Sequence, residues 1–212
     1  MPVRAKICGL STPETLDAAI AHGAAHVGFV FFPPSPRHLS FGRAAQLAQR
    51  VPDGVGRVGV FVDPDDALVD AAIAAGKLTA LQLHDTAPER AAALGARSGV
   101  DIWAAIAVRA RGDLDAARGF VGAADRLLYD AKTPPGASLP GGMGVRFDWA
   151  LLEGIIHRLP WALSGGLDPI NVGDAVAATG ADLVDVSSGV ESAPGIKAVD
   201  KIAAFLKACS SL

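Results

Sequence analysis

Short runs rich in valine, isoleucine and phenylalanine alternate along the whole chain with alanine- and leucine-rich stretches of helical period. This alternation constrains the fold most, because strands that alternate with helices pair in parallel through right-handed crossovers. The apolar runs predict strands at residues 3–8, 26–31, 56–62, 79–83, 101–107, 125–130, 161–164 and 183–187. The stretches between them predict helices at residues 14–21, 43–50, 66–75, 88–97, 114–120, 148–158, 169–179 and 199–208. The 212 residues divide into eight units of about 26 residues each.

Eight strand–helix units suit a closed barrel of parallel strands, and the chain is near the lower limit of ~200 residues for such barrels. The alternative is an open, doubly wound sheet. Its fingerprint, G-x-G-x-x-G, would follow an early strand, whereas the first strand here ends in Cys8-Gly9-Leu10-Ser11. No linker rich in proline and serine divides the chain. We therefore expect an α/β protein with one compact, single-domain (β/α)8 TIM barrel over residues 1–212.

Composition excludes several other classes of protein. Half of the residues are hydrophobic and 19% are charged, unlike a disordered chain. A net charge of −3 without a basic run argues against a nucleic-acid partner. No uncharged apolar stretch reaches the ~18 residues of a membrane-spanning helix, so we expect no membrane contact. The N-terminal residues do not resemble a signal peptide, and the chain has two cysteines, Cys8 and Cys209. These features predict a reduced, cytoplasmic protein.

In a barrel of this kind the chemistry lies where strands end and the following loops begin. The first strand alternates so that Arg4, Lys6 and Cys8 would face the barrel interior. Charged groups on an inner face are costly unless they have a function. A nearby Lys6 would favour the thiolate form of Cys8, and Gly9 would leave space beside the thiol. The alternative is that Cys8 is simply a small buried hydrophobic residue.

The predicted sixth strand ends in a carboxylate, Asp130, followed by a loop of fourteen residues rich in glycine and proline, at 131–144. Loops of this length without regular structure are uncommon in a compact domain and are usually functional. The alternative is an ordinary surface loop in which Asp130 acts as a cap.

Two glycine-containing loops follow the predicted seventh and eighth strands, where barrels of this class hold phosphate. Glycine lets backbone N–H groups approach an anion closely, although either loop alone would be read as a tight turn. The residues concerned are Ser164, Gly165, Gly166, Ser187, Ser188 and Gly189.

Two further side chains stand at strand ends. Arg37 lies in a proline-stiffened loop, 33–38, after the second strand. A guanidinium held in this way suits a carboxylate partner, bidentate where the geometry allows, and the alternative is a surface arginine. His84 ends the fourth strand and would be a polar contact or a structural cap.

No metal site is predicted, because the five histidines are scattered and no cluster has ligand spacing. Ser187 and Ser188 lack the strand–turn–helix context of a nucleophilic serine.

Taken together, motifs along nearly the whole chain resemble those of the phosphoribosylanthranilate isomerases, in the same order. The motifs are Lys6–Gly9, Gly28–Phe31, Ser35–Arg37, Gly59–Val62, Gln82–His84, Gly141–Trp149, Leu163–Leu167 and Asp185–Glu191. The resemblance implies an eight-stranded barrel that needs no cofactor. It also implies an Amadori rearrangement of N-(5′-phosphoribosyl)anthranilate to 1-(2-carboxyphenylamino)-1-deoxyribulose 5-phosphate, in tryptophan biosynthesis.

The resemblance also implies roles by position. Asp130 would be the general acid that opens the ribose ring, and Cys8 the general base that removes the proton from C2′. Arg37 would bind the anthranilate carboxylate. Lys6, His84 and Asp185 would contribute to the substrate pocket. The glycine loops would bind phosphate through Gly142, Gly144, Ser164, Gly165, Gly166, Ser187, Ser188 and Gly189.

Three departures from the family pattern are notable. One is that residues 194–200, after the loop of the eighth strand, read Pro-Gly-Ile-Lys-Ala-Val-Asp, which is looser than the usual Pro-Gly-x-Lys-Asp. Met143 stands where the family often has threonine or serine, and Asp85 stands where glycine is common. Two alternatives remain beside the isomerase. One is another phosphosugar isomerase barrel, such as that of histidine biosynthesis, which has an aspartate where Cys8 stands. The other is a non-catalytic barrel that binds phosphosugars. The expected partner is a small phosphoribosyl compound, and both a monomer and a homodimer are open.

Overall fold

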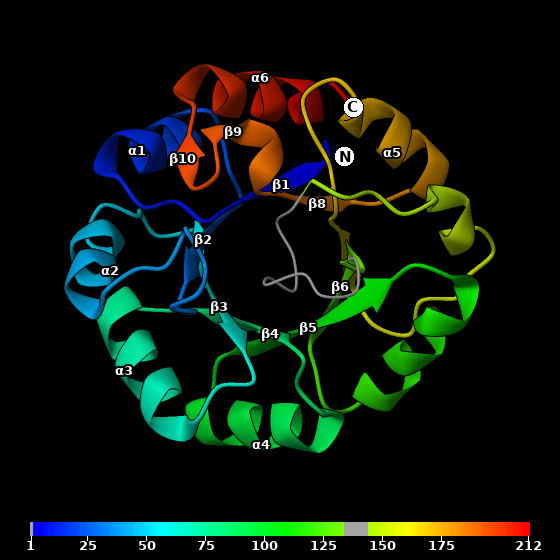
Figure 1. Cartoon of the computed structure of the whole chain (residues 1–212), viewed down its shortest axis with the longest axis horizontal. Coiled ribbons are helices and arrows are strands. Elements are labelled where there is room, and N and C mark those ends of the chain that lie inside the picture. Colours follow the sequence, from blue (N-terminus) through cyan, green and yellow to red (C-terminus); the bar gives the residue numbers. More distant parts are fainter. Residues whose placement is uncertain (1, 134–143) are drawn as a thin grey trace.

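Eight parallel strands form a closed barrel in which each strand pairs with its neighbours in chain order and β1 pairs with β8 (Figure 1). The computed structural model describes residues 2–133 and 144–212. The strands are β1 (Arg4–Cys8), β2 (His26–Val30), β3 (Gly56–Val62), β4 (Ala80–His84), β5 (Asp101–Val108), β6 (Arg126–Ala131), β7 (Trp161–Leu163) and β8 (Leu183–Val186). Every strand end lies within one residue of its predicted position. The predicted (β/α)8 barrel is confirmed.

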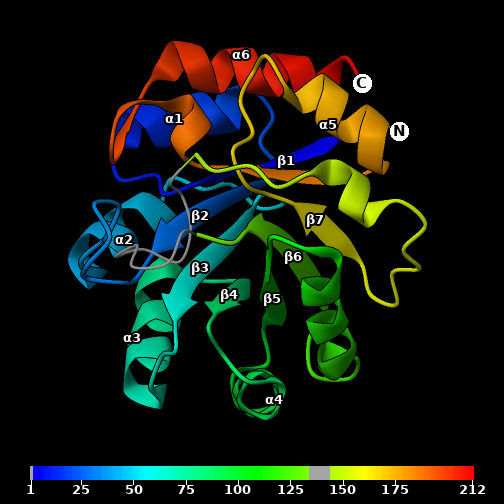
Figure 2. The ribbon, with the colours of Figure 1, turned by 45° about the vertical axis from the view of Figure 1, so that its right-hand side comes forward.

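Helices surround the barrel on its outside (Figures 1 and 2). They are α1 (Pro13–Ala21), α2 (Phe41–Ala48), α3 (Asp66–Gly76), α4 (Pro88–Ser98), α5 (Val172–Thr179) and α6 (Val199–Ser210). The first begins as its sequence suggests, because the Thr12 hydroxyl accepts a hydrogen bond from the Thr15 N–H at 3.3 Å and Pro13 occupies the first turn. None of the helices in the described parts of the chain has the length and hydropathy to span a bilayer.

Three predicted helices differ from the structure: two are 3-10 segments and one begins late. A 3-10 helix, η1 (Arg111–Phe120), follows β5, and only a single 3-10 turn, η2 (Trp149–Leu152), stands where a helix at 148–158 was predicted. Gly154 has a φ of +69°, which ends helical backbone just after this turn. The helix predicted at 169–179 begins late, at Val172. Asp168 accepts hydrogen bonds from the backbone N–H groups of Ile170 and Asn171, and this local turn competes with helix.

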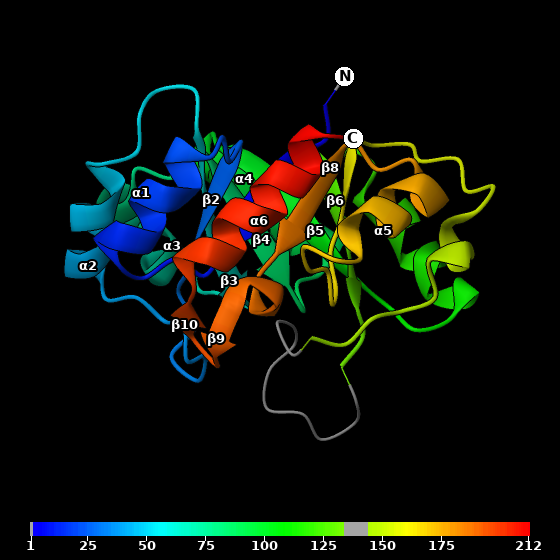
Figure 3. The same ribbon diagram turned by 90° about the horizontal axis from the view of Figure 1, so that it is seen from above.

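A small antiparallel hairpin was not predicted. After β8 the chain forms a 3-10 turn, η3 (Ser188–Val190), and then strands β9 (Glu191–Ala193) and β10 (Ile196–Lys197). Seen from the side, the hairpin lies on the opposite face of the barrel from the two chain ends (Figure 3). It therefore stands on the face where the strands end.

The barrel interior is filled in layers. One apolar cluster contains Val58, Ala80, Trp103, Leu128, Ala162 and Leu183, and a smaller one contains Cys8, Val30 and Val60. Lys6 is fully buried, and β1 and β8 pair in register so that Lys6 lies beside Asp185. Arg4, which was expected to face the same interior, is not buried. Its side chain is 48% exposed and forms an ion pair with Asp182, because the first inner position of the strand opens to solvent.

Candidate active site

A pocket opens at the end of the barrel where the strands finish. Its lining brings together most of the residues that the sequence singled out, namely Cys8, Arg37, His84, Asp130, Gly144, Ser164, Gly165, Gly166, Asp185, Ser187 and Ser188. Lys6 lies beneath them, fully buried. Gly189 is not among the lining residues; it packs tightly against the backbone of Leu167. Gly142 and Met143 lie outside the described residues.

Two glycines make room for the reactive groups. A Cβ on Gly28 of β2 would lie 3.1 Å from the Cys8 sulfur and 3.2 Å from Cε of Lys6, so Gly28 makes room for both side chains. Gly9, which was expected to leave space beside the thiol, instead makes room for another side chain. Its φ is +78°, and a Cβ there would lie 2.6 Å from Cδ of Arg37. The arginine can therefore cross the end of β1 to reach the pocket.

A buried chain of hydrogen bonds centres on Lys6. Its ammonium donates to Oδ1 of Asp185 at 2.7 Å and to Oε1 of Gln82 at 2.9 Å. The Ser164 hydroxyl donates to the other carboxylate oxygen of Asp185 at 3.2 Å. Burial lowers the pKa of Lys6, but the charges and hydrogen bonds of Asp185 and Cys8 together outweigh this and the pKa is raised overall. Lys6 therefore stays charged beneath the pocket.

The surroundings of Cys8 keep its thiol protonated. Burial raises the pKa of the thiol above its ordinary value of 9.0, and the negative charge of Asp185 adds to this rise. The Lys6 and Lys197 ammonium groups act in the opposite direction without outweighing it. Desolvation disfavours the charged form of any acid, and here it is the largest contribution. In the free protein Cys8 is therefore a thiol, although the nearby Lys6 was expected to favour the thiolate form.

Asp130 shows the opposite departure from an ordinary side chain. Burial, together with the nearby charge of Asp185, raises the pKa of its carboxyl from 3.8 to about 7. Its Oδ1 accepts a hydrogen bond from the backbone N–H of Ala131 at 2.9 Å, which limits the rise. A carboxylic acid with this pKa carries a proton for much of the time at neutral pH, and a general acid needs that proton.

His84 is held as a neutral imidazole, because burial lowers its pKa to about 4. Its Nε2 lies 2.9 Å from Nε2 of Gln82, whose Oε1 accepts from Lys6. The amide nitrogen of glutamine can only donate, so Nε2 of His84 must accept and its proton must lie on Nδ1. Lys6 thus sets the tautomer of His84 through two hydrogen bonds, by way of Gln82. Asp85, the next residue, has a φ of +49°, which explains why glycine suits this position.

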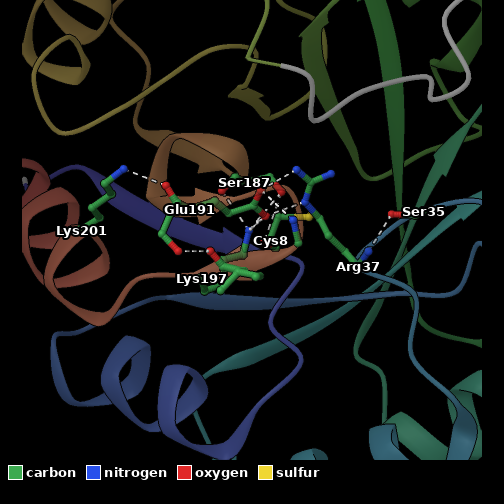
Figure 4. A network of polar contacts seen from close by, with 10 residues as sticks. Cys8, Ser35, Arg37, Ser187, Glu191, Lys197 and Lys201 are labelled. Atoms are coloured by element: carbon green, nitrogen blue, oxygen red, sulfur yellow. Dashed lines mark hydrogen bonds and ion pairs between the residues drawn. The ribbon is translucent and has the colours of Figure 1, made fainter.

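Arg37 forms an ion pair with a carboxylate of the protein itself, that of Glu191 (Figure 4). Its Nε and Nη2 donate to the two oxygens of Glu191 at 2.7 and 2.8 Å, and Lys197 donates to the same carboxylate at 2.7 Å. Burial alone would raise the pKa of Glu191, but these cations hold it below its usual range. Lys197 also donates to the backbone carbonyl of Ser187 at 2.9 Å, and Ser187 donates to the carbonyl of Cys8 at 3.3 Å.

Three of these residues, Gln82, Glu191 and Lys197, were not among the predicted site residues. A signal for Gln82 was present, because it shares the inner face of β4 with His84 at a spacing of two. Glu191 stood inside a quoted motif, but its partner Arg37 is 154 residues away in the chain. Lys197 stood in a Pro-Gly-x-Lys stretch similar to the family pattern, but the short hairpin that carries it was not predicted.

Comparison with known proteins identifies the family. Residues 5–208 match the family model described as N-(5′phosphoribosyl)anthranilate (PRA) isomerase. The N-(5′-phosphoribosyl)anthranilate isomerase of Paramagnetospirillum magneticum is 53% identical over 209 residues, which cover 98% of this chain and 97% of that protein. The chain belongs to the N-(5′-phosphoribosyl)anthranilate isomerase family. It is therefore an isomerase of tryptophan biosynthesis, and the family resemblance seen in its motifs is confirmed.

Solved structures of the same family have the same fold. Phosphoribosylanthranilate isomerase from Thermotoga maritima superposes with a TM-score of 0.89 at 36% identity, covering 99% of this chain and 100% of that one. A family structure in complex with reduced 1-(o-carboxyphenylamino)-1-deoxyribulose 5-phosphate has a TM-score of 0.86 at 33% identity, with coverage of 99% and 100%. A further Thermotoga maritima structure is of monomers generated from the dimeric enzyme.

Proposed function

We propose that this isomerase converts N-(5′-phosphoribosyl)anthranilate into 1-(2-carboxyphenylamino)-1-deoxyribulose 5-phosphate without a cofactor. Asp130 acts as general acid and Cys8 as general base. The observation that carries this assignment is the pKa of about 7 at Asp130, a buried carboxyl in the same pocket as a buried thiol. An aldose–ketose rearrangement needs one group that gives a proton and one that takes a proton.

The first step opens the sugar ring. Asp130 gives its proton to the ring oxygen, the bond from this oxygen to C1′ breaks, and the lone pair of the anthranilate nitrogen forms a C1′=N bond. The product is a positively charged Schiff base and an ionised Asp130.

The second step removes the proton from C2′. Cys8 must first release its own proton to solvent and become a thiolate to do this, and its pKa in the free protein is above 9.0. The positive charge of the Schiff base favours the thiolate, because an adjacent opposite charge stabilises an ionised group. The electron pair of the C2′–H bond forms a C1′=C2′ bond and neutralises the nitrogen. The resulting enol then gains a proton at C1′ and loses one from the C2′ hydroxyl, which yields the ketone.

The two anionic ends of the substrate are bound by different parts of the pocket. The loops after β7 and β8 contribute Gly165, Gly166 and Ser188 to the lining, and backbone N–H groups of glycine-rich loops suit phosphate. Arg37 binds the anthranilate carboxylate from the other side. The protein as a whole carries a charge of −3, so attraction of such a substrate depends on these local groups.

The test is steady-state kinetics of purified variants with N-(5′-phosphoribosyl)anthranilate. Cys8→Ala and Asp130→Asn should each lower kcat at least ~100-fold, the usual effect of losing a general acid or base. For the wild type, kcat/KM should fall above about pH 7 as Asp130 loses its proton, and this limb should vanish in the residual activity of Asp130→Asn. Near-wild-type turnover in either variant would refute the assignment. Turnover only of the histidine-pathway phosphoribosyl substrate, or binding without turnover, would favour the alternatives.

A further inference from the structure

The Arg37–Glu191–Lys197 cluster joins two segments that lie far apart in the sequence. Arg37 comes from the loop after β2, while Glu191 and Lys197 come from the β9–β10 hairpin (Figure 4). The hairpin turn is packed against the arginine loop. A Cβ on Gly195, where φ is +80°, would lie 2.7 Å from the carbonyl oxygen of Pro36. The two segments are thus in close contact beside the pocket.

Glu191 is engaged entirely by the protein. One of its oxygens accepts from Nε of Arg37 and from Nζ of Lys197, each at 2.7 Å. The other accepts from Nη2 of Arg37 at 2.8 Å and from the backbone N–H of Gly195 at 3.1 Å. The side chain is 4% exposed. A carboxylate with two hydrogen bonds on each oxygen acts on its neighbours rather than on a ligand, and a bidentate pair orients a guanidinium strongly.

The charges in the cluster do not cancel. One carboxylate lies between two cations, so the cluster retains a single positive charge beside the pocket. Without the carboxylate, Arg37 and Lys197 would be two buried cations repelling each other, and an unpaired buried charge is expensive. Arg37 would then have to turn away from its present position in the pocket lining.

We propose that Glu191 is a positioning residue for substrate binding. It holds the Arg37 guanidinium at the pocket wall in the orientation that receives the carboxylate of the substrate. Lys197 donates to the same oxygen of Glu191 as Nε of Arg37, and it ties the hairpin to the backbone of Ser187. The inference rests on the proposed function, because the carboxylate to be received belongs to the proposed substrate.

A double-mutant cycle tests this role. Glu191→Gln removes the negative charge and replaces one carboxylate oxygen by an NH2 group, which cannot accept the hydrogen bonds that Arg37, Lys197 and Gly195 donate. It should raise KM for N-(5′-phosphoribosyl)anthranilate at least about tenfold with kcat within about threefold, because uniform binding is lost. In an Arg37→Ala background the same change should raise KM no more than about twofold, since the two residues act together. The proposal would be overturned if the fold-changes in KM caused by Glu191→Gln and Arg37→Ala multiplied in the double variant. It would also be overturned if Glu191→Gln lowered kcat and the melting temperature and left KM unchanged.

Two further variants keep the test decisive. Asp17→Asn breaks another paired arginine and carboxylate, Arg50 with exposed Asp17, and should leave both kinetic constants unchanged. If Glu191→Gln does not fold, Glu191→Asp keeps the charge but withdraws it by one methylene. It should still raise KM, and an unchanged KM there would count against the proposal.

A spectroscopic measurement separates this proposal from the proposed function. In wild-type protein the Nε–H of Arg37 should give a slowly exchanging NMR signal, assigned by its loss in Arg37→Lys. The signal should disappear or broaden in Glu191→Gln, whether or not the protein has activity. An unchanged signal would overturn the positioning role, whereas absence of wild-type turnover would refute only the proposed function.

Discussion

The chemistry of the pocket depends on which buried groups hold protons. Cys8 and Asp130 are both acids whose pKa is raised by burial, but the consequences differ. A carboxyl near 7 can lose and regain a proton at neutral pH, whereas a thiol above 9.0 remains protonated until a positive charge forms beside it. The free protein is therefore better prepared to open the ring than to remove the C2′ proton.

Holding Asp130 protonated should make the protein less stable at high pH. Its pKa is raised from 3.8 to about 7, so the folded protein binds this proton more tightly than the unfolded chain. The resulting stability is fully present below pH 3.8 and is lost as the pH rises through about 7. Relative to Asp130→Asn, the wild type should lose about 2 kcal/mol between about pH 5.5 and 8.5.

Urea unfolding of both proteins at the two pH values measures this difference. Asp17→Asn is the control, because the pKa of exposed Asp17 is lowered by Arg50 and its contribution changes only at acid pH. A constant difference between wild type and Asp130→Asn would contradict the raised pKa.

The tautomer of His84 can be observed directly. The hydrogen bonds from Lys6 through Gln82 require the proton on Nδ1, and the pKa of about 4 keeps the ring neutral. We expect ring ¹⁵N shifts of a neutral Nδ1–H histidine, unchanged on lowering the pH to about 5. Gln82→Leu should release this restriction. A predominant Nε2–H form in the wild type would show that the hydrogen bond runs in the opposite sense.

At the scale of elements, the site depends on contacts between loops from different strands. Gly165, in the loop after β7, lies against the end of β6. With its φ of +91°, a Cβ there would be 2.7 Å from the Ala131 nitrogen and 3.2 Å from Oδ1 of Asp130. The glycine is therefore required by the position of the proposed acid as well as by its own backbone.

Gly165→Ala and Gly23→Ala separate these two requirements. Gly23 has nearly the same φ, +88°, with nothing within 4 Å of an added Cβ. Both variants should lose about 1 kcal/mol to backbone strain. Gly165→Ala should lose a further ~1–3 kcal/mol to overpacking, and its kcat should fall because Asp130 is displaced. Chemical denaturation and kinetics measure both effects, and equal losses in the two variants would contradict this account.

Across the whole molecule, one closed ladder of strands includes residues from both ends of the chain, since β1 pairs with β8. All eight strands therefore share one sheet, and the apolar layer between strands and helices is contiguous. We propose on this basis that residues 1–212 form a single cooperative domain.

Calorimetry tests this proposal. Unfolding should give one transition with an enthalpy of about 150 kcal/mol near 60 °C, from the usual ~0.7 kcal/mol per residue. The calorimetric and van't Hoff enthalpies should agree. Two separable transitions, each with part of this enthalpy, would show that part of the barrel unfolds alone.

The sequence by itself determined the barrel, the family and the identity of the pocket residues Cys8, Arg37 and Asp130. Periodicity and motifs depend on residues that are close together along the chain, so they can be recognised from the sequence alone. Local signals were weakest after β5 and β6, where 3-10 segments stand in place of the predicted helices. After β6, Gly154 ends the helical backbone.

Only the tertiary structure decided the protonation states and the pairing of charges. Lys6 was expected to favour the thiolate form of Cys8, but desolvation of the thiol by the surrounding fold outweighs this effect. Arg37 was expected to bind a carboxylate, and in the folded protein it binds that of Glu191, which is 154 residues away in the chain. Burial and long-range pairing depend on groups that are brought together only when the barrel closes, and the order of residues along the chain does not contain them.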